Sequence, residues 1–361
     1  MMTKGEHILR FFLCALCAFA VGFSVICPSV ASEATLAALS LCAVRVVPSL
    51  FLFMAAAKML SKCGGARLFS KFTRGVFEKL FGLSEGGGAV LFLGLLSGYP
   101  TGALVTAEFL QDKTMEKEEA ERILPFVTAA SPAFLIGAAG GMLGGTEEGL
   151  LLFFSQLASA FILLLVTRRK MSGIVRNSPK ERTATAISAV TSSIRECGGA
   201  ILTVCSFVTF FYVFSAMTLY LLPEGTPDML AAAISGFLEI SCGFAHASTM
   251  PDSILRAFVC GSVTGFGGIS VFMQSADALC ACGVSMKKYF LGKITQALLC
   301  GCFCAVAKWF RVGVNAWVLF GEQEGKIRAI WEIFVNFTVF AAVICTVLPL
   351  ILRILQNFSK K

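Results

Sequence analysis

Two interrupted apolar stretches decide the fold, LFLGLLSGYPTGALVTAEFL at residues 91–110 and AAAISGFLEISCGFAHA at residues 231–247. Each is apolar enough to enter a membrane, but glycine, proline or polar residues near its centre disfavour a continuous helix. Backbone groups at membrane depth need partners in the protein or in a water-filled cavity. We therefore predict two re-entrant hairpins, at 86–110 and 229–249, each returning to the side from which it enters.

The composition around these stretches indicates an all-α polytopic membrane protein. Hydrophobic residues make up 57% of the 361 residues and charged residues 14%, against about 25% charged residues in a typical soluble domain. This excludes a soluble globule, a disordered chain, collagen and a coiled coil. A span needs roughly 20 apolar residues. Eight spans are predicted, at 8–31, 34–57, 123–145, 149–167, 198–222, 254–280, 289–307 and 329–353.

The basic residues predict the orientation of the spans. Clusters of Lys and Arg lie at 58–79, 168–182 and 287–288. The connections 146–148 and 223–228 contain neither residue type. The positive-inside rule then places both termini in the cytoplasm and the chain in the cell membrane as a multi-pass protein. The net charge of +8 is accordingly assigned to cytoplasmic loops and not to a nucleic-acid partner. One predicted outer loop, 308–328, disagrees because it contains four basic residues.

The order of elements repeats with inverted topology, a signature of secondary transporters. Each repeat reads span, hairpin, span, span, and Ser97-Gly98-Tyr99 in the first hairpin is matched by Ser235-Gly236-Phe237 in the second, 138 positions later. The predicted regions are an N-terminal helix (1–33), a first repeat (34–167), a basic cytoplasmic connector (168–197), a second, inverted repeat (198–307) and an outer loop with a C-terminal helix (308–361).

Broken helices aim backbone amides and carbonyls at the middle of the membrane, where amide ends suit an anion and carbonyl ends a cation. The alternative is that these glycines only allow close helix packing. We expect a substrate site at the breaks. The predicted residues there are Gly98, Tyr99, Pro100, Thr101, Gly102, Ser131, Ser241, Gly265, Phe266, Gly267, Gly268, Ser270 and Gln274.

Four segments resemble the family of sporulation integral membrane proteins called YlbJ or SpoVV. They are SGYPTGALVTAEFL (97–110), EAERILPFVTAASPAFLIGAAGGML (119–143), SGFLEISCGF (235–244) and GFGGISVFMQSADAL (265–279). That family lies in the nucleoside recognition, or Gate, group, which is similar to concentrative nucleoside transporters. The resemblance implies a role in spore formation, with dipicolinate as the cargo at the outer forespore membrane. Gly268 stands where those transporters have a polar Asn, which argues against nucleoside recognition.

Two charged residues at membrane depth complete the predicted site, because burying a charge there is costly. Arg45 could pair bidentately with a carboxylate of the solute, or form a structural ion pair with Glu108 or Glu239. Glu239 corresponds approximately to an acidic substrate-contacting position of the nucleoside transporters. It could couple transport to a proton or a sodium ion. The sequence leaves both questions open.

We expect a transporter for a small anionic aromatic solute that works by alternating access. The alternatives are a nucleoside-type transporter and a sporulation scaffold without transport. No enzyme, cofactor or metal site is expected, because the 15 cysteines mostly lie in apolar runs and the chain has only two histidines. The expected partners are the lipid bilayer and a small organic anion, and homo-oligomerisation is left open.

Overall fold

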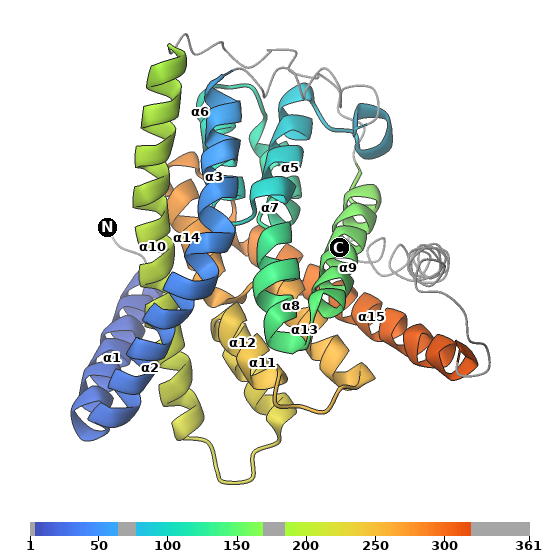
Figure 1. Ribbon diagram of the computed structural model, residues 1–361. Coiled ribbons are helices and arrows are strands. Elements are labelled where there is room, and N and C mark those ends of the chain that lie inside the picture. Colours follow the sequence, from blue (N-terminus) through green and yellow to red (C-terminus); the bar gives the residue numbers. More distant parts are fainter. Residues whose placement is uncertain (1–3, 64–76, 169–184, 319–361) are drawn as a thin grey trace.

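The structure is a computed structural model that describes residues 4–63, 77–168 and 185–318, and these residues form an all-α bundle (Figure 1). Its first half contains α1 (Lys4–Ile26), α2 (Pro28–Leu41), η1 (Cys42–Val46), α3 (Val47–Lys62), α5 (Glu85–Ser97), α6 (Thr101–Gln111), α7 (Lys117–Val127), η2 (Phe134–Ala139), α8 (Gly140–Leu143) and α9 (Thr146–Val166). Its second half contains α10 (Ala186–Tyr220), α11 (Asp228–Leu238), α12 (Ile240–Ala247), α13 (Ile254–Phe266), α14 (Gly268–Leu279), η3 (Cys280–Cys282) and α15 (Met286–Val318).

Five helical stretches of the described residues are long and apolar enough to cross a membrane. They are Pro28–Leu60, Thr146–Val166, Ile187–Tyr220, Ile254–Cys282 and Met286–Arg311. These stretches overlap five of the eight predicted spans and confirm a polytopic membrane protein. The predicted span 123–145 is instead two short helical pieces, and the span 329–353 lies outside the described residues. The first predicted span, 8–31, contains a shorter apolar helix, Cys14–Ile26.

Both interrupted stretches form helical hairpins. Helix α5 packs beside α6, and α11 packs beside α12. In Figure 1 the first hairpin opens toward the upper end of the molecule, where α10 begins, and the second toward the lower end, where α10 finishes. This arrangement agrees with hairpins that approach the centre from opposite faces. That they are re-entrant in a bilayer stays a prediction.

Close glycine pairs allow each hairpin to fold tightly. A Cβ atom added to Gly102 would lie 3.4 Å from the Cα of Gly94, and one added to Gly236 would lie 3.3 Å from the Cα of Gly243. The two hairpins therefore correspond at an offset close to 142 positions, not at the 138 expected from the tripeptide match. Ser97 ends α5 at the tip, whereas Ser235 lies almost one turn before the tip of the second hairpin.

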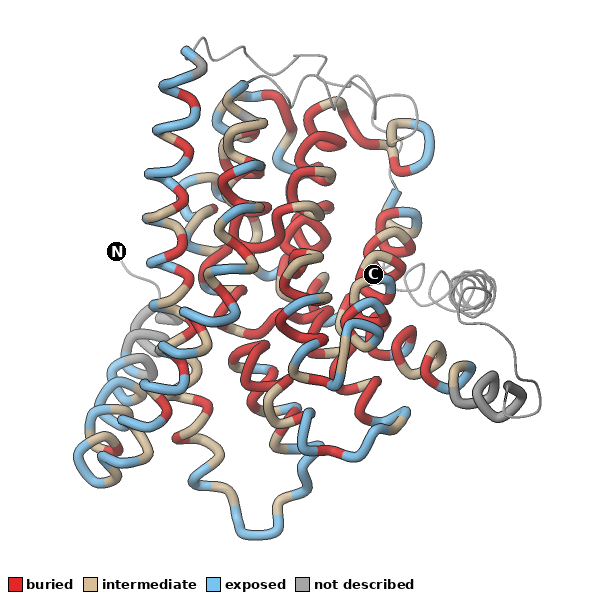
Figure 2. Tube along the Cα trace, in the orientation of Figure 1, coloured by how far each residue is buried: buried red, intermediate tan, exposed pale blue. Residues whose placement is uncertain are grey.

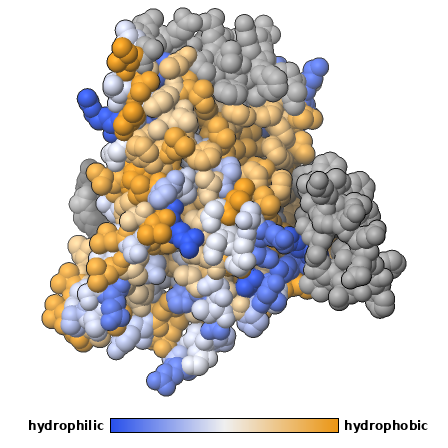
Figure 3. All heavy atoms as spheres, in the orientation of Figure 1, coloured by the Kyte–Doolittle hydropathy of each residue, from blue (hydrophilic) through white to orange (hydrophobic). Residues whose placement is uncertain are grey.

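Large apolar side chains face outward around the bundle, as expected for a lipid-facing surface. Leu52, Leu202 and Phe210 are all more than half exposed. Figure 2 shows buried residues concentrated on the inner helices, and apolar side chains cover much of the face seen in Figure 3. The buried residues of the two halves form the core against which the hairpin tips pack.

Candidate functional site

The first broken helix lies between α7 and η2, at residues 128–133. The Gln156 side chain on α9 satisfies both backbone groups of Ala130, accepting from its amide and donating to its carbonyl at 2.9 Å each. The Ser131 hydroxyl accepts from the amide of Phe134 at the start of η2. Protein atoms thus satisfy the backbone of this break, as buried backbone requires. Pro132 lies at the end of this break.

The tip of the first hairpin docks directly on this break. The amide of Tyr99 donates to the carbonyl of Ala129 at 2.9 Å. A Cβ atom added to Gly98, whose φ is +74°, would lie 2.6 Å from the Ser131 nitrogen. Only glycine fits both this backbone conformation and this contact. The predicted residues Gly98, Tyr99 and Ser131 are therefore brought together.

The second hairpin and the second broken helix meet in the same way. Glu239 is the single residue that separates α11 from α12, and its buried carboxylate accepts from the amide of Cys242 at 3.0 Å. Gly267, with a φ of +86°, separates α13 from α14, and Gly268, the first residue of α14, has a φ of +89°. A Cβ atom on Gly268 would lie 3.2 Å from the Cα of Glu239. The Glu239 break therefore faces the Gly268 break.

Aromatic side chains join the two halves at the centre. The Tyr99 ring lies 6.5 Å from that of Phe134, which lies 6.3 Å from that of Phe244 on α12. Helix α14 of the second half also contacts α6 of the first half. The two hairpins are therefore linked across one central region.

Two half-helices begin at these breaks without a side-chain cap. Helix α6 follows Pro100 and α14 follows Gly267, and neither residue makes a side-chain capping bond. Their far ends meet, since Gln111 and Cys282 line one pocket. With 11 and 12 residues, both helices are about 17 Å long. Their N-termini therefore lie at similar depth. The distance from the shared C-terminal end is about half the thickness of a 30 Å hydrocarbon core.

Buried polar atoms near these N-termini lack partners among the described residues. They are the Tyr99 and Thr101 hydroxyl oxygens and the Gln274 amide oxygen. The Gln274 amide nitrogen donates to the Ser270 hydroxyl at 3.2 Å. Buried polar groups are normally satisfied, so each exception needs an explanation. A ligand or water at the centre would supply the missing partners.

Other predicted residues serve packing. A Cβ on Gly265 would meet the backbone of Gln296 and Ala297, and Phe266 stacks on Phe237 at 5.1 Å. The close-packing alternative therefore applies to Gly265. Ser241 is buried in the first turn of α12.

Arg45 lies in the π-helical turn η1 and is exposed. Its guanidinium is beside Gly141, where an added Cβ would lie 2.7 Å from Nη1. Among the described residues, Arg45 forms no ion pair with Glu108 or Glu239, so the alternative of a structural ion pair with either residue is not present. Its role toward a solute stays a prediction.

Gln156 and Lys293 are the central residues that sequence reasoning missed. Lys293 on α15 is only 1% exposed, and its ammonium donates to the carbonyl of Thr128, at 3.2 Å, within the first break. A lysine and a glutamine inside otherwise apolar runs were the available signals. Their partners could not be identified from the sequence, because they lie far away along the chain.

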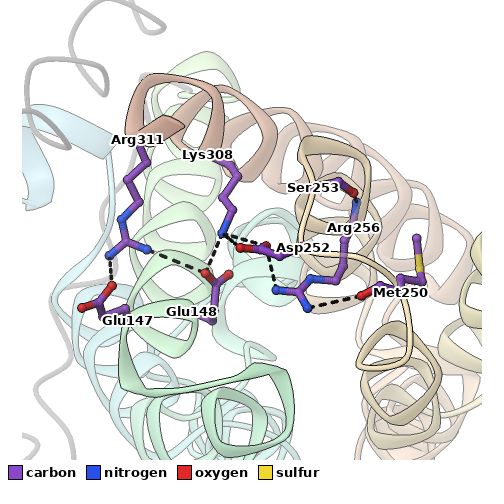
Figure 4. Close-up of polar contacts among 8 residues, drawn as sticks. All are labelled: Glu147, Glu148, Met250, Asp252, Ser253, Arg256, Lys308 and Arg311. Carbon is purple, nitrogen blue, oxygen red and sulfur yellow. Dashed lines mark hydrogen bonds and ion pairs between the residues drawn. The ribbon is translucent and has the colours of Figure 1, made fainter. Parts of the chain in front are cut away.

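An ion-pair network at the lower end of the bundle ties the first half to the second (Figure 4). The Lys308 ammonium on α15 lies 2.8 Å from Glu148 on α9 and 2.8 Å from Asp252, and Arg311 pairs with Glu147 at 3.0 Å. Burial would raise the pKa of Asp252, but the hydrogen bonds and charges of Lys308 and Arg256 outweigh it and hold the pKa below its usual range.

This network accounts for two of the four basic residues in the predicted outer loop 308–328, and the other two lie outside the described residues. Lys308 and Arg311 belong to α15 and not to a loop, and both are paired with carboxylates. Near the other end of α15, Lys288 pairs with Glu121 at 2.6 Å. The helical rise puts Lys288 and Lys308 about 30 Å apart, the thickness of the hydrocarbon core. The two ion pairs therefore mark both edges of the apolar part of α15.

Comparison with known proteins supports the resemblance given by the sequence motifs. The chain is 26% identical over 321 residues to the sporulation integral membrane protein YlbJ of Bacillus subtilis strain 168, covering 76% of this chain and 77% of that protein. No family model matches the chain. A sporulation role in a membrane fits this similarity and the apolar helices described above. The likeness to nucleoside transporters stays a prediction.

Proposed function

We propose that this protein carries a small anionic aromatic solute across a sporulation membrane by alternating access, with dipicolinate as the cargo. One observation carries the proposal: α6 and α14 start at the central breaks as uncapped half-helices beside buried, unpartnered hydroxyl groups. The N-terminus of a helix attracts anions, because its dipole end is positive and first amides that lack a partner can donate to the anion. In α6 the amides of Gly102 and Ala103 already donate to the carbonyls of Gly98 and Pro100, so this end offers a solute its dipole and the Thr101 hydroxyl.

The chemistry of the two breaks favours a dicarboxylate. Two N-termini match two carboxylate groups, and the Thr101 and Tyr99 hydroxyls can donate to them. The rings of Tyr99, Phe134 and Phe244 supply an aromatic surface for a planar ring. Each bound carboxylate needs such donors, since an unpaired charge in an apolar interior is prohibitively costly. These features together support an anionic aromatic cargo.

The two alternatives are less well supported. A polar side chain at position 268 would be needed for the nucleoside motif, but Gly268 is in contact with the backbone of residues 238–240 and has a positive φ. A scaffold without transport would be expected to have a dry, apolar centre. Here the centre contains Thr101, Glu239 and Gln274, all buried.

Binding and uptake by the purified protein test the proposal. We expect dipicolinate to raise the melting temperature of the protein and labelled dipicolinate to accumulate in proteoliposomes, more than uridine or benzoate. Benzoate, an aromatic ring with one carboxylate, tests whether the second carboxylate is required. Uridine tests whether the protein recognises nucleosides. Preferential binding of uridine, or no uptake of any of the three solutes, would overturn the proposal.

A further inference from the structure

We propose that Lys293 is a built-in cation that fills the carbonyl end of the first broken helix, so that no sodium ion binds there. This inference rests on the proposed function, because it concerns how the same carrier is energised. The geometry that carries it is the position of the Lys293 ammonium among oxygen atoms released by the end of α7.

The ammonium of Lys293 is enclosed by neutral oxygen acceptors. It lies 3.4 Å from the carbonyl oxygen of Pro125, 3.2 Å from that of Thr128 and 3.0 Å from the Oε1 atom of Gln296. The side chain is 1% exposed. Among the residues that the structure describes, no carboxylate lies within ion-pair distance of it. Three acceptors match the three donors of an ammonium group.

The site has the chemistry of a cation site. The last carbonyls of a helix are unpaired and carry the negative end of its dipole, and carbonyl oxygens of broken helices coordinate sodium ions in secondary transporters. In this chain the same kind of oxygen set, at the C-terminus of α7, is already occupied by a tethered ammonium. A free sodium ion would have to displace Lys293 from a buried position.

Packing holds Lys293 in place. Gly292 lies against the ring of Pro125, so that α15 can approach the end of α7 closely. One turn before Lys293, the Tyr289 hydroxyl lies 3.2 Å from the Ser275 hydroxyl of α14. Helix α15 therefore lies against both the end of α7 and α14, which places Lys293 close to the helix whose N-terminus we assign to the anion.

The break between α11 and α12 contains a side chain of the opposite charge. Glu239 places a carboxylate at the N-terminus of α12, whereas Lys293 places an ammonium at the C-terminus of α7. The chain thus supplies its own ion at one helix end of each half. The N-termini of α6 and α14 are left for a solute.

Ion replacement and a cavity-forming variant test the inference on the full-length protein. For the unmodified protein, we expect equal melting temperatures, and equal dipicolinate uptake, in sodium chloride and choline chloride at matched ionic strength. Lys293→Ala should melt several degrees lower and take up dipicolinate about tenfold more slowly, the effect of removing a charged hydrogen-bond donor. Propylammonium should restore part of its melting temperature, and tetramethylammonium, which has no N–H donors, should not.

Lys287→Ala is the matched control, because Lys287 lies on the same helix and is exposed. It should behave like the unmodified protein. A melting temperature of the unmodified protein that rises specifically with sodium would overturn the inference, even if Lys293→Ala fails to fold. Lack of rescue by propylammonium would overturn it as well. Absence of dipicolinate uptake in the unmodified protein would instead count against the proposed function, and the two melting comparisons would still decide the role of Lys293.

Discussion

Gln156 on α9 forms two hydrogen bonds with the backbone of a single residue, Ala130, at 2.9 Å each. Ala130 lies in the middle of the first broken helix, where the chain has no helical partner for its amide or carbonyl. The side-chain amide therefore replaces the backbone bonds that the break removes. It also fixes the surface on which the tip of the first hairpin docks.

We predict that Gln156→Leu destabilises the protein strongly. The substitution keeps a similar volume but leaves a buried amide and a buried carbonyl without partners, at about 1–3 kcal/mol for each group. Thermal unfolding in detergent measures the loss. Gln111→Leu is the control, because Gln111 is exposed. Equal melting temperatures for the two variants would show that water replaces the Gln156 bonds.

Gly102→Ala should prevent the first hairpin from closing. An added Cβ would collide with the carbonyl oxygen of Val127, and this backbone atom cannot move aside as the end of a flexible side chain could. Overpacking of this kind typically costs about 1–3 kcal/mol. Gly137→Ala is the matched control, because nothing lies within 4 Å of its added Cβ. A lower melting temperature for Gly102→Ala alone confirms the close approach, and similar values for both variants refute it.

Thr101→Val tests the anion site without changing the shape of the side chain. It removes a buried hydroxyl that has no partner among the described residues. We expect weaker dipicolinate binding, because a hydrogen bond to a charged group contributes about 1.5–3 kcal/mol, or about 10- to 100-fold in affinity. Thr106→Val is the control, since the Thr106 hydroxyl already donates to the Gly102 carbonyl at 2.7 Å. Unchanged binding by Thr101→Val would place the solute elsewhere.

The positions of the breaks could be predicted from the sequence, because glycines mark them directly. Gly98, Gly267 and Gly268 have positive φ values that other residues rarely adopt. The partners of the breaks could not be predicted. Gln156 and Lys293 reach Ala130 and Thr128 from distant helices, and nothing in the local pattern specifies such contacts.

The repeat was predicted in outline but not in register. The match of Ser97 with Ser235 suggested the wrong offset between the two repeats. Ser97 lies at the tip of the first hairpin, whereas Ser235 lies almost one turn before the tip of the second. Short tripeptides are uninformative here, because small residues recur wherever helices pack closely. The pairs Gly94 with Gly102 and Gly236 with Gly243 define the register through contact instead.

Glu239→Gln should separate the capping role of this residue from a role in ion coupling. A glutamine oxygen can still accept from the amide of Cys242, so the variant should fold and bind dipicolinate normally. Its uptake should be slower if a proton acts through the carboxylate. Glu239→Ala removes the cap as well and should lose about 0.5–2 kcal/mol of stability. Binding and initial uptake rates are the two measurements. Normal uptake by Glu239→Gln would exclude coupling through this carboxylate.

The ion pairs of Lys308 should make part of the stability dependent on pH. In the folded protein the pKa of Asp252 is below its usual range. Burial raises this pKa, but the hydrogen bonds and positive charges of Lys308 and Arg256 lower it by more. A depressed carboxyl pKa stabilises the folded state above the unfolded value of about 3.9. This contribution is lost as the pH falls through the lower, folded value. Asp252→Asn should therefore melt below the unmodified protein near neutral pH.

The difference between the two melting curves should shrink as the pH falls below about 3.9, because the unmodified protein then loses the same charge that the asparagine lacks. Asp277→Asn is the control, since Asp277 is exposed and forms no ion pair among the described residues. It should match the unmodified protein at neutral pH. A constant difference between Asp252→Asn and the unmodified protein across the acidic range would mean that Asp252 stabilises the lower end of the bundle through packing. A shrinking difference would show that its charge, held between Lys308 and Arg256, ties α15 to α13.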